Sequence, residues 1–460
     1  MADTGIRDYG ADARAVKLDN NSDVLRFAAK QHGATKGALF DTVHFATGAL
    51  TPRAAQALET FLRGPARHLE LKHLVIDNPE SLLGSSPGLA AAFAGLTDLS
   101  HLELLSAGQH SRELLRDMKA KLTTVNLVMV PVEDDLDEED AAWQATGRNP
   151  ITLLTNFQDT LESLTGERTE TLCVEELSYP QRYPNVSEIF LEDVDLPITV
   201  HYAHAYPNLS ALKIRTDIED FVELLKDERN APVLRRQQNI VEQLAHGCWP
   251  SLSYCDSTLG TLYILGLQCH VHDLRILADI AGPGMLKSVL MDTRPTVLTL
   301  HQFTLDMLSD RDFASLMRGS GVRQLKTLEI TLVLDEHSGK GVGIAAAFNA
   351  MISALEPLKI TAFGLTLACN FPGPYPREAR GPPPRIFLTP EEMFLHDLQL
   401  DELAEKTLSA VSSLRSVVVM MVAHRTRSPA AAALGETVGT ELRTYTMAKA
   451  YGLLHGTVAG

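Results

Sequence analysis

The sequence predicts an α/β fold in which short parallel strands alternate with helices along the chain, as one irregular solenoid. Three observations lead to this prediction: a turn phrase that recurs, a spaced apolar triplet that follows it, and helical periodicity between the triplets. A strand and helix of this kind cannot bury their apolar faces alone, so neighbouring pairs must stack on one another. We therefore expect a parallel sheet on the concave side and helices on the outside.

The turn phrase is the clearest internal repeat. Residues 183–187 read Tyr-Pro-Asn-Val-Ser, and residues 206–210 read Tyr-Pro-Asn-Leu-Ser. A looser copy, Trp-Pro-Ser-Leu-Ser, stands at 249–253. A doubly wound α/β enzyme is the alternative fold, but such an enzyme has no need to repeat a turn.

The apolar triplet after the phrase has the L-x-x-L-x-L spacing of a leucine-rich repeat, which predicts a ribonuclease-inhibitor-like horseshoe. Its unequal spacing along the chain predicts an irregular array. The copies are Leu71/Leu74/Ile76, Leu99/Leu102/Leu104, Leu122/Val125/Leu127, Val186/Ile189/Leu191, Leu209/Leu212/Ile214, Leu259/Leu262/Ile264, Leu286/Val289/Met291, Leu325/Leu328/Ile330, Leu355/Leu358/Ile360, Leu395/Leu398/Leu400 and Leu414/Val417/Val419.

Helices are expected where apolar residues recur at helical spacing between the triplets. Pro52–Arg63 shows this spacing, and Pro52 suits the first turn of a helix. Similar patterns predict helices within 341–356, 114–122 and 151–161.

The organisation that follows from these elements has three parts. Residues 1–38 form an N-terminal segment, 39–425 the solenoid, and 426–460 a C-terminal helical cap or tail. Insertions are expected near 133–150, which is acidic, 219–248, which should form a projecting helix, and 370–392, which is rich in proline.

Composition excludes several classes of protein. The chain has 58 acidic against 41 basic residues, a net charge of −17, which argues against nucleic-acid binding. No apolar run approaches the ~20 residues of a membrane span, and the N-terminus lacks a signal-peptide core. Five cysteines suit free thiols in a reducing compartment, so we expect a cytoplasmic or nuclear protein.

Catalytic motifs are weak. Gly84–Gly88 fits a nucleophile elbow, but Pro87 has no N–H to donate to an oxyanion. Gly341, Gly343 and Ala346 match a dinucleotide loop and leave a nucleotide-binding α/β enzyme as the alternative function.

The potential soft metal ligands also lack a standard pattern. The cluster of Cys248, Cys255, Cys269, His270 and His272 matches no standard zinc spacing. We therefore expect no catalytic residue, no cofactor and no metal.

A protein-binding surface is expected on the concave face of the sheet. Strand side chains alternate, so the residue between the last two apolar positions of each triplet points away from the helices. Phe190 and Tyr263 are the expected aromatic anchors. The predicted contact residues are Glu103, Asn126, Phe190, Lys213, Tyr263, Glu329 and Lys359.

Leu39–Phe45, the helix Pro52–Arg63 and the strand 68–77 resemble fungal F-box proteins with divergent leucine-rich repeats. The resemblance covers about 39–425 and implies the substrate-recognition part of a ubiquitin ligase, with a Skp-type adaptor as partner. An F-box opens with a leucine-proline phrase, whereas residues 1–38 contain no proline. Only 24–37 could correspond to its last helix, so the box is incomplete or missing.

Overall fold

The structure is a computed structural model that describes residues 15–31, 40–64, 71–131, 148–169, 180–194, 196–216, 231–278, 283–309, 311–334, 343–369 and 388–435. The chain divides into two compact units, which we describe separately. The N-terminal unit is Ile6–Trp249 with Ile264–Gly266, and the C-terminal unit is Met1–Gly5, Pro250–Tyr263 and Leu267–Gly460. The predicted α/β class with a mostly parallel sheet is confirmed in both.

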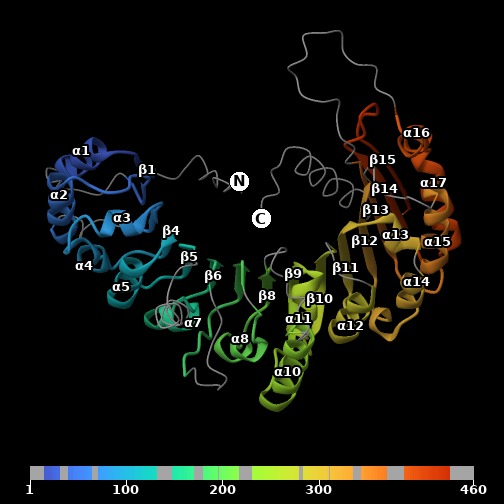
Figure 1. Ribbon diagram of the computed structural model, residues 1–460, viewed down its shortest axis with the longest axis horizontal. Helices are drawn as coiled ribbons and strands as arrows, with labels where there is room; N and C mark the ends of the chain where they lie inside the picture. Colours follow the sequence, from blue (N-terminus) through green and yellow to red (C-terminus); the bar gives the residue numbers. More distant parts are fainter. Residues whose placement is uncertain are drawn as a thin grey trace, which may run out of the picture. The chain divides into compact units, whose positions relative to one another are not determined.

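The strands of the N-terminal unit pair in chain order, and every pair is parallel. They are β1 (Ala15–Leu18), β2 (Thr42–Phe45), β3 (His73–Ile76), β4 (His101–Ala107), β5 (Thr124–Met129), β6 (Ser163–Glu167), β7 (Glu188–Glu192) and β8 (Ala211–Ile214). The helices are α1 (Asn21–Gln31), α2 (Pro52–Arg63), α3 (Pro79–Leu83), α4 (Leu89–Ala94), α5 (Gln109–Asp117), α7 (Pro150–Leu153), η2 (Thr155–Phe157), α8 (Thr199–Ala205) and α10 (Ala231–His246). The described helices lie on one side of these strands (Figure 1).

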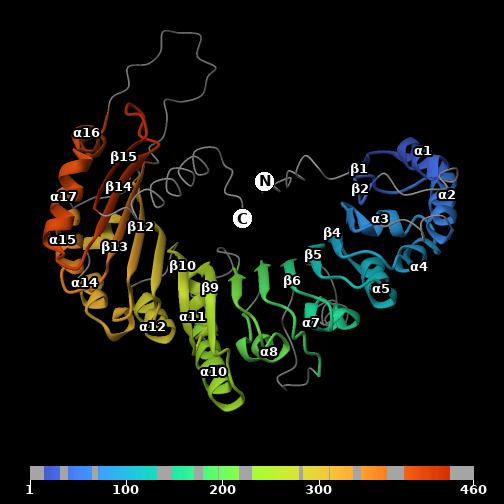
Figure 2. The same ribbon diagram turned by 180° about the vertical axis from the view of Figure 1, so that it is seen from behind.

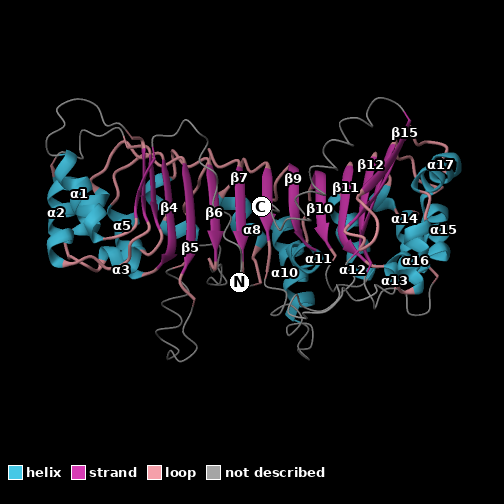
Figure 3. Ribbon diagram, turned by 90° about the horizontal axis from the view of Figure 1, so that it is seen from above, coloured by secondary structure: helices cyan, strands magenta, loops and turns pink. Residues whose placement is uncertain are grey.

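The C-terminal unit repeats this arrangement, except that its last described strand pairs antiparallel. Its strands are β9 (Ser251–Thr258), β10 (His270–Leu277), β11 (Val297–Phe303), β12 (Thr327–Leu334), β13 (Ala362–Cys369), β14 (Ser416–Val422) and β15 (Ala430–Gly435). Its helices are α12 (Pro283–Thr293), α13 (Leu305–Ser309), α14 (Arg311–Met317), η3 (Ser320–Val322), α15 (Ile344–Leu355), α16 (Pro390–Asp397) and α17 (Leu400–Ala410), and α11 (Leu259–Leu265) spans the boundary between the units. Seen from behind, the described helices again keep to one side of the strands (Figure 2), and from above the strands of each unit stand side by side (Figure 3).

Helix α2 shows why the helical predictions succeed. Thr51 caps its N-terminus by accepting from the Ala54 N–H, and Pro52 occupies the first turn. Leu58 and Phe61, on the expected face, are at most 1% exposed. The bounds Pro52–Arg63 match the prediction, and α15 falls within the predicted 341–356. The predictions near 114–122 and 151–161 are wrong in extent, because α5 ends at Asp117 and the second contains only α7 and η2.

The described part of the N-terminal segment belongs to the N-terminal unit. Strand β1 pairs with β2, and α1 packs on α2. Phe27 of α1 meets Phe40 at 5.2 Å and Phe61 at 5.1 Å between ring centroids. The boundary expected at residue 38 therefore does not separate α1 from the repeats.

The recurring turn phrase links successive repeats through the same contacts. Asn185 donates from Nδ2 to the Asp159 carbonyl at 2.6 Å, and Asn208 donates to the Pro184 carbonyl at 2.8 Å. The buried rings of Tyr183 and Tyr206 lie 5.2 Å apart. Each turn is thus hydrogen-bonded to the turn before it, which explains why the phrase recurs.

Several triplets are not strands. Leu259/Leu262/Ile264 lies in α11 and Leu286/Val289/Met291 in α12. Of the triplet Leu395/Leu398/Leu400, the first residue lies in α16, the second follows that helix, and the third begins α17. Leu355 ends α15, and Leu358 and Ile360 lie in the loop before β13. Helix α11 is buried on nearly every side, and in α12 Leu286 and Val289 are buried whereas Met291 is exposed, so three apolar residues at this spacing do not by themselves identify a strand.

The predicted insertions lie partly outside the described residues, which omit 132–147, 217–230 and 370–387. Residues 390–392 already belong to α16, and 231–246 form α10, which does not stand free. Its Asn239 and Gln243 are buried and donate to the carbonyls of Ile264, Leu265 and Gly266. Of the helical cap or tail expected at 426–460, the described residues 430–435 form the strand β15 and not a helix.

Candidate functional site

The helix-free face of the N-terminal unit presents side chains in rows across the strands. Strand register places equivalent residues opposite one another, and every second side chain points away from the helices. We call one such set the central row, and all its members except Val75 are partly exposed. The central row is His44, Val75, Glu103, Asn126, Thr165, Phe190 and Lys213.

Four predicted contact residues lie together in this row. Lys213 Nζ sits 3.8 Å from the centre of the Phe190 ring, a cation–π contact. Asn126 donates from Nδ2 to Glu103 Oε2 at 3.4 Å. Thr165 separates these pairs, and the sequence reasoning missed it because β6 has Gly166 where the triplet expects an aliphatic residue.

Charged groups continue from Phe190 toward the ends of β6 and β7. Arg168 pairs with Glu167 at 2.6 Å and with Asp193 at 3.8 Å. Burial raises the pKa of Glu192 above its ordinary value, although Lys213 and Arg215 oppose that shift. The face therefore offers an aromatic ring surrounded by charges of both signs.

Histidines occupy the other end of the same face. The His73 and His101 rings stack at 4.1 Å, and His44 Nε2 lies 2.6 Å from Asp77 Oδ1. Burial, followed by the neighbouring His73, lowers the pKa of His101 although Glu162 opposes the shift. The shared sequence signal is a histidine directly before the buried leucine of two consecutive strands, which the triplet search did not include.

The lowered pKa of His101 predicts a pH dependence of stability. The folded protein binds the proton less tightly than the unfolded chain, so stability is lost as pH falls below the ordinary histidine value of 6.5. We expect His101→Gln to lose less stability between pH 7.5 and 5.5 than the parent protein, measured by urea unfolding at both values. Equal losses in the two proteins would contradict the assignment.

The remaining predicted contact residues lie elsewhere. Glu329 is on the helix-free face of β12, in register with Thr299 and Gly364 of the C-terminal unit. The strand placement expected for Tyr263 is wrong, because this residue lies in α11. The strand placement expected for Lys359 is also wrong, since this residue lies in the loop between α15 and β13.

The alternative nucleotide loop is only partly described. Gly341 lies outside the described residues, Gly343 is the N-cap of α15, and Ala346 lies in its first turn.

Burial raises the pKa of the Cys255 thiol, one of the potential soft metal ligands, well above its ordinary value, so the thiol stays protonated. Within the described ranges, no three His, Cys, Asp or Glu side chains are arranged to hold a metal ion.

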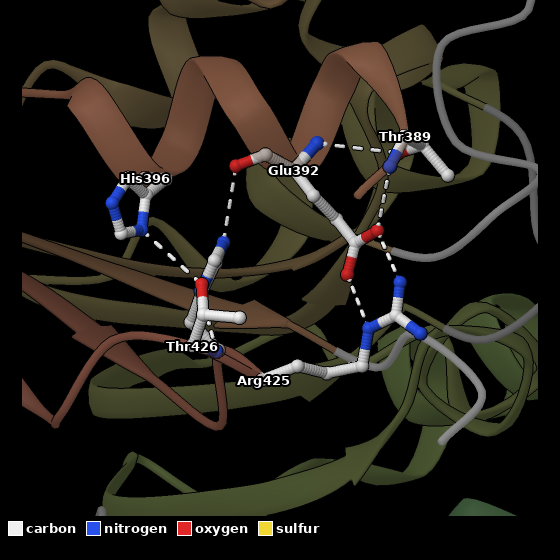
Figure 4. Close-up of polar contacts among 6 residues, drawn as sticks. Thr389, Glu392, His396, Arg425 and Thr426 are labelled. Atoms are coloured by element: carbon white, nitrogen blue, oxygen red, sulfur yellow. Dashed lines mark hydrogen bonds and ion pairs between the residues drawn. The ribbon is translucent and has the colours of Figure 1, made fainter. Parts of the chain in front are cut away.

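A second polar cluster anchors α16 to the segment after β14 (Figure 4). Glu392 is fully buried, and its carboxylate accepts from the Arg425 guanidinium and from the Thr389 N–H at 2.8 Å. Burial disfavours the charged carboxylate, but these hydrogen bonds outweigh it and hold the Glu392 pKa below its ordinary value. Nearby Cys369 is buried, which raises its pKa to about 12. The cluster is a structural clamp, since its carboxylate is occupied and the thiol is protonated.

No helix among the described residues is long and apolar enough to cross a membrane. No known protein-family model matches the chain, and no curated protein is significantly similar to it in sequence. The candidate site therefore stands on its own geometry.

Proposed function

We propose that the chain is a non-catalytic protein-interaction scaffold, and that the central row of the N-terminal unit binds its protein partner. The observation that carries this proposal is the Phe190 ring with Lys213 above it, on a face free of described helices. Aromatic residues are common energetic centres of protein interfaces, and polar or charged groups usually surround them at the rim.

The chemistry of the face indicates the partner segment that fits it. Phe190 offers apolar contact, and Lys213 offers a cation at the edge of that contact. Glu167 and Glu192 lie at the next position along β6 and β7. A matching segment carries an apolar side chain between an acidic and a basic residue.

We further propose that the repeats are of the leucine-rich type and form an irregular solenoid, as part of a substrate receptor in a ubiquitin ligase of the cytoplasm or nucleus. The shared register of the central row and the repeated asparagine contacts support a repeat architecture. Co-purification of a Skp-type adaptor and cullin with the full chain tests the receptor role. Recovery of other partners without that adaptor would restrict the role to a scaffold.

Photo-crosslinking tests the proposed face directly. We expect a photoreactive residue at Thr165, in the central row, to capture a partner from native extract. The matched control places the same photoreactive residue at position 56, where Gln56 is exposed on helix α2. Equal labelling from both positions would contradict the proposal.

Phe190→Ala is expected to weaken capture at Thr165 by at least about tenfold, as loss of an anchor does. Tyr263→Ala removes an aromatic ring from α11 and should leave capture unchanged. Binding is measured by titrating the captured partner against each purified variant, with circular dichroism to check folding. Unchanged affinity in a folded Phe190→Ala variant would remove Phe190 from the interface.

A further inference from the structure

The helix-free face of the C-terminal unit carries its own contact between an aromatic ring and a cation. The guanidinium carbon of Arg275, in β10, lies 5.0 Å from the centre of the Tyr254 ring in β9. Arg275 also donates from Nη2 to Asp273 Oδ2 at 3.2 Å, and the Tyr254 hydroxyl donates to Asp256 Oδ2 at 3.1 Å. We call Tyr254, Asp256, Asp273 and Arg275 the Tyr254 patch.

Strand alternation places the Tyr254 patch on the side away from the described helices (Figure 2). The residues between its members, Cys255 of β9 and Leu274 of β10, point to the helix side and are fully buried. The side chains of Asp273 and Arg275 are 24% and 26% exposed. The patch is therefore partly open to a side chain from a partner.

The charges of the Tyr254 patch favour a cation. Two carboxylates stand against one guanidinium, so the net charge of the patch is −1 (1 − 2). Burial, followed by the neighbouring Asp256, raises the pKa of Tyr254 although Arg275 opposes the shift, so the hydroxyl adds no charge. In the row that contains Asp256 and Arg275, the next charged side chain is Glu329 of β12. The face therefore attracts a basic group and repels an acidic one.

One carboxylate oxygen of the patch lacks a donor. Asp273 Oδ1 is buried and accepts no hydrogen bond from the described residues. A buried acceptor without a donor is costly, and more so when it is charged. Rotation about the Cβ–Cγ bond exchanges the two oxygens of Asp273, so a second donor can enter while Arg275 keeps the first. The ammonium group of lysine and the guanidinium group of arginine supply both the donor and the positive charge.

We propose that the Tyr254 patch is a second interaction surface, which binds a lysine or arginine side chain from an extended basic segment of a protein partner. Asp273 accepts from this cation, and a second basic residue of the segment reaches Glu329. Strand β12 lies two strand spacings from β10, ~9.6 Å, and residues three apart in an extended segment lie ~10 Å apart. This surface belongs to the C-terminal unit, so it is independent of the function proposed for the central row.

Two peptides that differ only in charge test this surface. The probe is acetylated Ser-Gly-Arg-Ser-Gly-Arg-Ser-Gly, and its twin carries citrulline, a neutral analogue, in place of both arginines. Each is titrated into the full chain by calorimetry at ~150 mM salt, which screens the general attraction to a chain of net charge −17. We expect the arginine peptide to bind at least about tenfold more tightly than the citrulline peptide, because only arginine brings a cation to Asp273.

Two variants with the same change in net charge locate the binding. Asp273→Asn should weaken binding of the arginine peptide at least about tenfold, because it removes the carboxylate that accepts from the cation. Glu405→Gln removes one negative charge from an exposed position on α17 and should change the affinity less than about twofold. Glu329→Gln lies outside the Asp273–Arg275 pair and should also weaken binding, so the test does not depend on a variant that disturbs that pair. Circular dichroism checks that each variant is folded.

Phe190→Ala separates this surface from the central row and should leave the affinity for the arginine peptide unchanged. Loss of binding in that variant would place the peptide on the central row and overturn the proposal. Equal affinities of the two peptides, absence of binding by both, or equal losses in Asp273→Asn and Glu405→Gln would also overturn it.

Discussion

Replacing Glu392 with alanine is expected to lower the free energy of unfolding of the C-terminal unit by about 3–5 kcal/mol, since breaking a buried ion pair leaves an uncompensated charge. Glu392 is fully buried, and the side chain of its partner Arg425 is 18% exposed. The change also removes the capping box that Glu392 makes with Thr389 at the start of α16. Because the pKa of Glu392 is lowered, its contribution is lost as pH falls below the ordinary value of 4.5.

Urea unfolding at neutral pH, with hydrogen exchange of the α16 amides, measures this effect. Glu405→Ala removes an exposed carboxylate from α17 and should change stability by no more than ~0.5 kcal/mol. Glu392→Gln keeps a hydrogen-bond acceptor, so its loss in the free energy of unfolding should fall between those of Glu392→Ala and Glu405→Ala. A loss in Glu392→Ala no larger than in Glu405→Ala would show that the clamp is not stabilising.

Asn239→Leu is expected to lower the free energy of unfolding of the N-terminal unit by at least about 3 kcal/mol. The substitution leaves three buried polar groups unpaired, and each such group costs ~1–3 kcal/mol. The buried amide of Asn239 accepts from the Thr199 N–H at 3.1 Å. It also donates to the carbonyls of Pro197 at 2.9 Å and Ile264 at 2.8 Å. Leucine has a similar size but can satisfy none of these groups.

Gln237→Leu is the matched control, because Gln237 is exposed on the same helix. Both variants are followed by thermal unfolding and by hydrogen exchange of the α8 amides. We expect faster exchange in α8 only for Asn239→Leu. Equal stability of the two variants would show that water or a rearranged backbone replaces the lost bonds.

The sequence predicted the elements in which local period and burial agree. The triplets at 99–104 and 122–127 became β4 and β5, and the alternation within them placed Glu103 and Asn126 on the helix-free face. The strand prediction at Tyr263 failed because α11 is buried on nearly every side, so the leucine and isoleucine that flank Tyr263 are both buried, as they would be in a strand. The same apolar triplet therefore occurs in both strands and helices, and only the pairing with distant strands distinguishes the two.

Buried polar side chains account for most of what could not be predicted. Asn239 and Glu392 are fully buried although each is polar and follows another polar or charged residue, Gln238 and Glu391. Their burial depends on carbonyls and a guanidinium that lie far away along the chain. No local period carries that information, so the anchoring of α10 and α16 required the structure.

The register of the central row also fixes the distances between its side chains in the N-terminal unit. Neighbouring positions are held by backbone hydrogen bonds at the ~4.8 Å spacing of adjacent strands, whatever side chain each strand presents. A substitution at Thr165, Phe190 or Lys213 therefore changes the side chain on one strand without shifting the positions of the other two. Gain or loss of a whole strand–helix unit would change the length of the row in a single step and leave its pitch intact.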